Sequence, residues 1–503
     1  MSYSAAIDQL SAMAPELYTH PGQPRRKFSL DEVRILLAAL GDPHRRFRSV
    51  LIAGTNGKGS TAATLASILT ASGARVGLYT SPHLERINER IRIGNSEIAD
   101  DLFAHLYFRV HDVAQQLVQR GRLPQHPSFF EILTAMAFLC FAEEKVDLAV
   151  LEVGMGGRLD ATNVVDPLLS IITDISLDHT EWLGSTLAAI AREKAGILRQ
   201  GGTMIRLPQS TEADDVLSAM ARELGVRWVN ASSFLPPIID LSNQSNELGA
   251  PGLGAPSFPS GTPGPGSPQT GLRLWGGDPS HLGTRENKTP IDDQIDSTSA
   301  PYTVTVLGSS IEVASPLTGG HQRRNIALAI AAAIELASSH GFTITPASIE
   351  QGIRLTRWPG RLEYIKQGRI ERGEISWILD VAHNPAGAWA VRAGLPRVPG
   401  GGKAQTLVFS CLRDKPLTEM AQILFPLFER VILTPLHSAR AASMEDLVAA
   451  AQLTQTPFLV AESVAAALQL SREHTSSGPI IVCGSVYLVG EARSLLLAKG
   501  GIA

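Results

Sequence analysis

The chain is poor in cysteine and aromatic residues, and it has neither a large charge excess nor a long hydrophobic run. Its three cysteines, Cys140, Cys411 and Cys483, lie in separate apolar segments without a Cys-x-x-Cys pair, which indicates buried thiols in a reducing compartment and argues against a catalytic cysteine. Lys plus Arg number 44 against 48 Asp plus Glu, so the charge balance gives no reason to expect a nucleic-acid or membrane partner.

The longest helical apolar run, residues 326–336, is too short to span a bilayer, and the N-terminus has no basic segment followed by an apolar core. We therefore predict a soluble, cytoplasmic protein, and we expect a monomer. With 503 residues, the chain is long enough for two or three domains with separate cores.

The most informative segment is a glycine-rich turn between an apolar strand-like run and a helical pattern. It reads Gly54, Thr55, Asn56, Gly57, Lys58, Gly59, Ser60, Thr61. Backbone N–H groups of such a turn face a phosphate, the lysine adds a positive charge, and a hydroxyl of Ser60 or Thr61 can reach Mg²⁺. Gly59 stands where the common phosphate loop has Ser or Thr, and this form resembles the ATP loop of the Mur ligase superfamily.

Strand-like runs alternate with helical patterns, which favours an α/β fold with a P-loop-type, doubly wound parallel sheet. We predict strands at 50–53, 76–80, 148–153 and 168–175, and helices at 131–143 and 187–198. Residues 234–301 are rich in Pro, Gly and Ser, and we predict a flexible insertion there. Patterning returns at 302–306 and in a helix at 325–338, and Trp358, Pro359 and Gly360 indicate a hinge. Further strands at 375–379, 406–409, 430–433 and 480–483 predict a smaller Rossmann-like domain, which gives domains of 1–356 and 357–503.

Polar residues follow several of these strands. Ser81, Glu152 and His179 come at or just after strand ends, so with Ser60 they should meet at one edge of the sheet, Glu152 as a Walker-B-like acid. Ser and Glu suit Mg²⁺ well and His less so. Taken singly, Ser81 could be a turn residue, Glu152 a solvated charge and His179 a loop histidine; as a set behind a phosphate loop, they favour a functional site.

Longer blocks of sequence resemble the folylpolyglutamate synthase/dihydrofolate synthase family across nearly the whole chain, the insertion apart. They span residues 80–84, 129–131, 152–163, 178–184, 193–197, 320–325, 359–363 and 379–385. Val381 stands where the family usually has glycine.

The resemblance implies an ATP-dependent ligase with ATP between two domains, held by the loop and by residues matching Asn325, Arg361, Asp380 and His383. It further implies magnesium ligation, up to two ions, by residues matching Ser60, Ser81, Glu152, His179 and a carbamylated Lys194, with Lys58, His179 and Lys194 catalytic. From the residues alone, Lys194 could be an exposed helical lysine, Arg361 a hinge salt bridge, and Asp380 and His383 helix caps.

The implied substrates are L-glutamate and dihydropteroate or reduced folates. Their predicted contacts are Phe130, Glu131, Gly157 and Arg158, although Phe129 and Phe130 could equally be core residues. In the implied reaction, a carboxylate attacks the γ-phosphate of ATP, and glutamate then attacks the acyl phosphate. Two other classes compete: a Mur ligase acting on a cell-wall nucleotide, and a nucleotide-binding switch without ligase activity.

Overall fold

The computed structural model describes residues 2–13, 29–236, 300–370, 373–395, 404–476 and 478–498. The predicted insertion lies almost wholly outside the described residues. Two larger sheets and one hairpin account for the strands of the described part. Each larger sheet is mainly parallel and alternates with helices along the chain, so the predicted α/β fold with a second α/β domain is confirmed.

The first sheet has eight strands in the order β4-β3-β2-β5-β1-β6-β7-β8. Only β3 and β4 run antiparallel to their neighbours. The strands are β1 (Arg48–Ala53), β2 (Val76–Tyr79), β3 (Ile91–Ile93), β4 (Ser96–Glu97), β5 (Leu148–Glu152), β6 (Leu169–Ile172), β7 (Thr203–Arg206) and β8 (Arg227–Asn230). Because β1 lies between β5 and β6, the segments that follow these three strands meet at one edge of the sheet.

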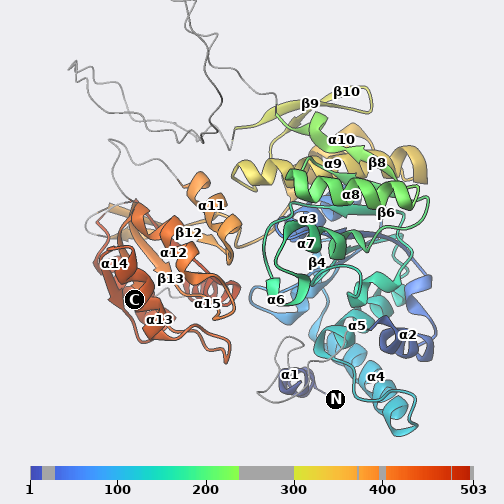
Figure 1. Ribbon diagram of the computed structural model, residues 1–503, viewed down its shortest axis with the longest axis horizontal. Helices are drawn as coiled ribbons and strands as arrows, with labels where there is room; N and C mark the ends of the chain where they lie inside the picture. Colours follow the sequence, from blue (N-terminus) through green and yellow to red (C-terminus); the bar gives the residue numbers. More distant parts are fainter. Residues whose placement is uncertain are drawn as a thin grey trace, which may run out of the picture. The chain divides into compact units, whose positions relative to one another are not determined.

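Helices cover both faces of this sheet, with α9 and α10 on the upper side of Figure 1 and α4 and α5 on the lower side. The helices of this part are α1 (Tyr3–Ala12), α2 (Leu30–Ala39), α3 (Lys58–Ala71), α4 (Asp100–Gln119), α5 (Phe129–Glu143), α6 (Thr180–Leu183), α7 (Leu187–Ala195), α8 (Thr211–Glu223), α9 (Gly320–His340) and α10 (Pro346–Leu355). The hairpin of β9 (Tyr302–Val306) and β10 (Ser309–Val313) packs with α3, α9 and α10 in one core cluster.

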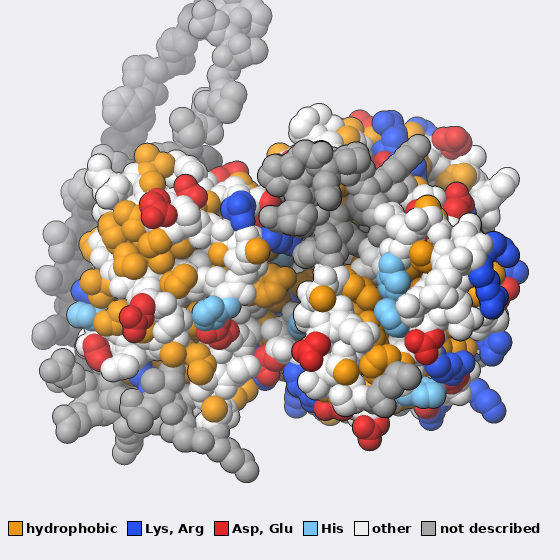
Figure 2. Space-filling model, turned by 90° about the horizontal axis from the view of Figure 1, so that it is seen from below, with side chains coloured by type: hydrophobic (Ala, Val, Ile, Leu, Met, Phe, Trp, Pro, Cys, Tyr) orange, Lys and Arg blue, Asp and Glu red, His pale blue; other side chains and the backbone are white. Residues whose placement is uncertain are grey.

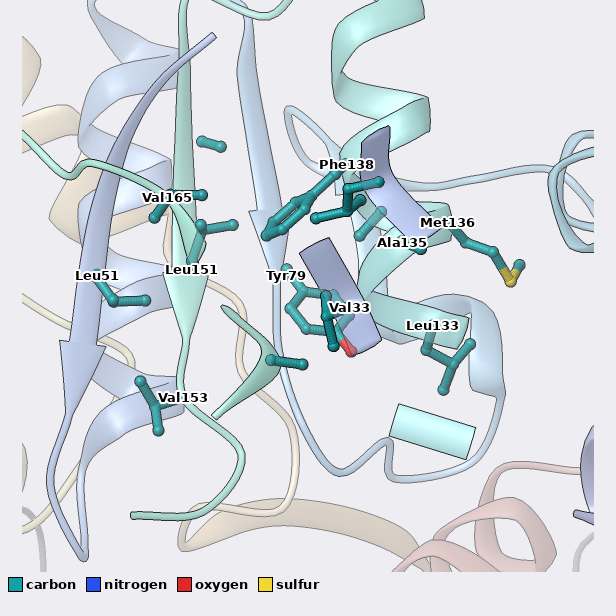
Figure 3. Close-up of a cluster of buried hydrophobic side chains, with 14 of the residues drawn as sticks. Val33, Leu51, Tyr79, Leu133, Ala135, Met136, Phe138, Leu151, Val153 and Val165 are labelled. Carbon is teal, nitrogen blue, oxygen red and sulfur yellow. The ribbon is translucent and has the colours of Figure 1, made fainter. Parts of the chain in front are cut away.

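The other face of the first sheet packs on α2, α4 and α5. Figure 3 shows the rings of Phe138 and Tyr79 between the strands that carry Leu51 and Leu151 and the helix that carries Leu133. All five side chains are fully buried. Burial of this apolar surface is the main stabilising contribution to this part of the fold, and it holds the strand ends in fixed positions.

The second sheet has the order β11-β12-β16-β13-β14-β15, and only the edge strand β11 is antiparallel. Its strands are β11 (Glu363–Ile370), β12 (Gly373–Asp380), β13 (Ala404–Phe409), β14 (Phe428–Leu433), β15 (Phe458–Val460) and β16 (Gly478–Cys483). Its helices are α11 (Pro385–Gly394), α12 (Leu417–Leu424), α13 (Met444–Leu453), α14 (Val464–Glu473) and α15 (Val486–Leu497).

Several predicted boundaries were wrong: the helix expected at 325–338 spans Gly320–His340, and two other elements end earlier than expected. The strand expected at 168–175 ends at Ile172, because Asp174 instead forms an isolated bridge with Asn56 of the glycine-rich turn. The helix expected at 187–198 ends at Ala195, because Gly196 follows as its cap, where a Cβ would come within 2.4 Å of the Arg158 side chain. Both early ends come from contacts with residues far away in sequence.

The burial of the cysteines and the mixed surface charge agree with the sequence composition. The three cysteines are buried and unpaired, as predicted. On the face drawn in Figure 2, acidic and basic side chains are interspersed. Within the described residues, no helix is both long and apolar enough to cross a membrane. The compartment, the monomeric state and the domain boundary at 356/357 stay predictions.

Candidate active site

The glycine-rich turn connects the end of β1 to the first residue of α3. Gly57 caps the helix in a left-handed conformation, with φ of 89°. A Cβ on Gly54 would lie 1.8 Å from the Thr173 hydroxyl, and one on Gly57 would lie 2.1 Å from Oδ1 of Asn325. Glycine is therefore required at both positions, and the turn brings backbone N–H groups to a helix N-terminus, which is an anion-binding arrangement.

Lys58 is the first residue of α3, and its side chain folds back over the turn. Its Nζ donates hydrogen bonds to the carbonyl oxygens of Gly54 and Thr55, both at 3.1 Å. Burial lowers the pKa of this amine, although the charges of Glu152 and Asp178 act in the opposite direction. Ser60 and Thr61 are buried just behind it, and the Thr61 hydroxyl has no hydrogen-bond partner among the described residues.

Glu152 is the last residue of β5 and is only 5% exposed, so the alternative of a solvated strand-end charge was wrong. Its Oε2 accepts a hydrogen bond from the Ser81 backbone N–H at 3.1 Å. Burial raises the pKa of this carboxyl, and the nearby positive charge of Lys58 opposes the rise. In the described part of the chain no ion pair within 4 Å neutralises Glu152, so this buried carboxylate suits a cation.

His179 adopts a left-handed conformation, with φ of 51°, at the start of α6. Burial lowers its pKa to about 4, so the imidazole is neutral near pH 7 and a ring nitrogen is available as a ligand. Ser81 and His179 both line the cavity described below, whereas Ser60 lies in the first turn of α3. Among the described residues, His, Cys, Asp and Glu form no group of three suited to a metal, so an ion here would also need serine oxygens, waters or a modified lysine.

Lys194 lies on α7 and is 4% exposed, which contradicts the alternative of an exposed helical lysine. Its Nζ donates to the Gly54 carbonyl at 2.7 Å, so Lys194 and Lys58 share one acceptor. Burial, followed by the charge of Lys58, lowers the pKa of Lys194 to about 7. A large fraction of this amine is therefore neutral, and hence nucleophilic, at neutral pH.

Asp178 precedes His179 and contacts three residues from the part of the chain that forms the second sheet. Its carboxylate accepts hydrogen bonds from Lys415 Nζ at 2.8 Å and from Asn384 Nδ2 at 3.1 Å, and His383 Nε2 lies 3.7 Å away. Burial alone would raise the pKa of Asp178, but His383, His179 and Lys415 together hold it well below its usual range. The carboxylate therefore stays ionised and orients these groups.

The remaining predicted nucleotide residues lie on α9 and around β12. Asn325 is buried beside Gly57, and its Nδ2 donates to Gln322 Oε1 at 2.9 Å. Asp380 accepts from the N–H groups of Leu362 and Ala382, at 2.9 and 2.8 Å. The N-cap of α11 is Asn384. The alternative that Asp380 and His383 are helix caps was therefore wrong.

Arg361 precedes Leu362 in the same connection. Its Nη1 donates to the Gly360 carbonyl at 3.1 Å, and no ion pair within the described residues includes it, which contradicts the hinge salt-bridge alternative. Burial lowers the pKa of Arg361, and the charge of Asp380 opposes the change. Its assignment to ATP stays a prediction.

A cavity of about 380 Å³ is lined on one side by Ser81 and His179. The predicted substrate residues Phe130, Glu131, Gly157 and Arg158 all line it. Three of them also have structural contacts: the Phe130 ring lies 5.9 Å from the ring of Tyr79, Glu131 completes a capping box with Ser128, and Arg158 pairs with Glu193 at 2.9 Å.

The cavity lining also includes residues that the sequence reasoning missed. Arg90 and Lys415 line it, and Asn384 joins the same edge through Asp178. Lys415 has no local motif, because its partner Asp178 is 237 residues away in sequence. Arg90 lies shortly after residues 80–84, which resemble the family, and this position was a weak indication that it belongs to the site.

Trp358 explains why the turn has Gly59 rather than Ser or Thr. A Cβ on Gly59 would lie 2.9 Å from Cζ2 of the Trp358 ring. We predict that Gly59→Ala weakens ADP binding about tenfold, because overpacking shifts the start of α3. Titration calorimetry with Mg²⁺ and ADP measures the change. The double variant Gly59→Ala/Trp358→Ala should regain most of the affinity, and a double variant no better than Gly59→Ala would contradict this explanation.

A glycine-rich turn that connects a strand of a parallel sheet to a helix, followed by a second α/β region, is the arrangement of nucleotide-dependent ligases of the Mur type. Residues 52–207 match the Mur ligase middle domain, and residues 360–486 match the Mur ligase glutamate ligase domain.

Curated relatives and solved structures point to one family. Folylpolyglutamate synthase of Lacticaseibacillus casei is 32% identical over 94% of this chain and 96% of its own length. Dihydrofolate synthase/folylpolyglutamate synthase of Bacillus subtilis is 30% identical over 93% and 95%. A Mycobacterium tuberculosis folylpolyglutamate synthase structure complexed with ADP is 28% identical, covers 99% of both chains and has a TM-score of 0.76. The chain belongs to the folylpolyglutamate synthase/dihydrofolate synthase family of ATP-dependent glutamate ligases.

Proposed function

We propose that this protein joins L-glutamate to the carboxylate of dihydropteroate or of a reduced folate, with ATP as the energy source. The observation that carries the proposal is the juxtaposition of the phosphate turn, the buried Glu152 and the aromatic-lined cavity at one sheet edge. The family membership supports it, and so do the names of the relatives. Both competing classes fit less well, since the relatives reported above are folate enzymes and a switch would need no substrate cavity.

The turn and Lys58 would bind the phosphates of ATP, with Asn325, Arg361, Asp380 and His383 as further nucleotide contacts. A substrate carboxylate oxygen attacks the γ-phosphorus in line, and ADP leaves with the electrons of the broken P–O bond. The amino group of L-glutamate then attacks the carbonyl carbon of the acyl phosphate, and phosphate leaves. The protein positions the reactants, excludes water and neutralises the spreading phosphoryl charge.

Ser60, Ser81, Glu152 and His179 would hold Mg²⁺, which supplies additional positive charge beside the phosphates. The buried Glu152 carboxylate without an ion-pair partner in the described residues and the neutral His179 fit this assignment. The pKa of about 7 at Lys194 supports a carbamate there, because a neutral amine can react with CO₂. A carbamate would convert a cationic side chain into an anionic one able to bind a second ion.

The test is a product assay on the purified chain with ATP, Mg²⁺ and L-glutamate and with either dihydropteroate or tetrahydrofolate. We expect ADP release that depends on both glutamate and the pterin compound, and a product heavier by one glutamyl residue. Comparison of the two pterin substrates decides whether one or both activities are present. ADP release without any pterin compound, and without an amide product, would contradict the proposal.

A further inference from the structure

Arg90 is a buried cation that faces the cavity. It ends the short helix η2 (Ile87–Arg90), is 8% exposed and lines the cavity together with Phe129 and Phe130. Its Nε donates to Nδ1 of His83 at 2.9 Å, and its guanidinium carbon lies 5.2 Å from the centre of the Phe129 ring. These two contacts fix the direction of the guanidinium group without neutralising its charge.

The acidic residues around Arg90 are engaged elsewhere or lie further away. Glu89 accepts hydrogen bonds from the backbone N–H groups of residues 84, 85 and 86. Glu152 acts on Arg90 only as a nearby charge. His83 accepts a hydrogen bond from Arg90 through its ring nitrogen and carries no negative charge that could compensate the guanidinium. Within the described residues, no ion pair includes Arg90.

The other three cations in the cavity lining are already paired. Arg158 pairs with Glu193 at 2.9 Å, Lys415 with Asp178 at 2.8 Å and Arg440 with Asp414 at 2.9 Å. In the part of the chain that the structure describes, Arg90 is therefore the cavity-lining cation without a carboxylate partner. A buried charge of this kind is costly unless a ligand of opposite charge completes it.

We propose that Arg90 binds the carboxylate of the pterin substrate that undergoes phosphorylation, and thereby selects carboxylate-bearing ligands; this inference rests on the proposed function. The planar guanidinium suits a carboxylate, and the neighbouring Phe129 and Phe130 suit the aromatic ring that carries it. One carboxylate oxygen stays on Arg90 while the other forms the bond to the γ-phosphorus. Arg90 thus holds the carboxylate that reacts, in a cavity that Ser81 also lines.

The experiment compares pteroate with its carboxamide, which has the same shape but no charge. Calorimetric titrations in the presence of Mg²⁺ and ADP use the wild type, Arg90→Met and Arg90→Lys. The wild type should bind pteroate at least about tenfold more tightly than the carboxamide, since a hydrogen-bonded charge pair is lost. Arg90→Met should bind both ligands equally, and Arg90→Lys should fall between the two because it keeps the charge without the planar fork.

Arg92→Met is the matched control. Arg92 lies two residues further on, on β3, and lines a different hollow with Arg357, so its replacement should leave the preference for the carboxylate unchanged. If Arg90→Met keeps the wild-type preference and changes only the melting temperature, Arg90 is a structural link between His83 and Phe129, and the inference is wrong. Wild-type protein that binds ADP but neither pterin compound would overturn the proposed function together with the inference.

Discussion

Replacement of Lys58 by alanine is expected to abolish most ligation while the fold stays intact. The amine lies over the turn, within hydrogen-bond distance of the Gly54 and Thr55 carbonyls, where it adds a positive charge beside the predicted phosphate site. Loss of one such charge-stabilising group lowers kcat by roughly 10²- to 10³-fold. ADP release and amide formation, measured at saturating ATP, give the change in kcat.

The fold should tolerate this substitution, because Lys194 still donates to the Gly54 carbonyl. Lys366→Ala removes an exposed lysine on β11 and should turn over like the wild type. Circular dichroism and thermal melting identify any unfolded variant. Near-normal turnover in a well-folded Lys58→Ala protein would refute the phosphate-loop assignment.

A similarly large effect is expected for Lys194→Ala. If Lys194 carries a carbamate, its loss removes an anionic ligand, and kcat should fall by at least about 100-fold while ADP still binds to the turn. Arg192→Ala, an exposed position on the same helix, should have little effect. Acetate should partly restore the rate of Lys194→Ala by occupying the space of the carbamate, and chloride at equal ionic strength should not.

The same residue predicts a pH dependence. Only the neutral amine reacts with CO₂, and the pKa of Lys194 is about 7. Wild-type protein that has been stripped of CO₂ should therefore regain activity on addition of bicarbonate above about pH 7, and less so as the pH falls below it. Intact-protein mass spectrometry under mild conditions measures the carbamate directly. Full activity in Lys194→Ala, or an unmodified Lys194 in the active protein, would contradict this role.

Local pattern was sufficient to predict the glycine-rich turn and, to within one residue, the ends of β2 and β5. A glycine-rich turn between a strand and a helix is determined mainly by backbone geometry, while Glu152 ends β5 and Ser81 lies two residues after the end of β2. The buried environment of Lys194 could not be predicted from helical periodicity, because its burial depends on the approach of the Gly54 turn, 140 residues earlier.

Two site residues could not be predicted from the sequence for the same reason, which is that their contacts are long-range. Lys415 and Asn384 meet Asp178 across more than 200 residues of sequence, and no local spacing indicates such a pairing. The early ends of β6 and α7 likewise arise from tertiary contacts of Asp174 and Gly196. Sequence therefore predicted the position of the glycine-rich turn between β1 and α3 better than the charge pairing of the cavity, which only the fold determines.

The most direct test of the central claim, ligation through an acyl phosphate, is an isotope-transfer measurement. Dihydropteroate labelled with ¹⁸O in its carboxylate is incubated with the protein, ATP, Mg²⁺ and L-glutamate, and the released phosphate is analysed by mass spectrometry. If the substrate carboxylate attacks the γ-phosphorus, one labelled oxygen should appear in phosphate for every amide formed. Amide formation with unlabelled phosphate would contradict the acyl phosphate mechanism.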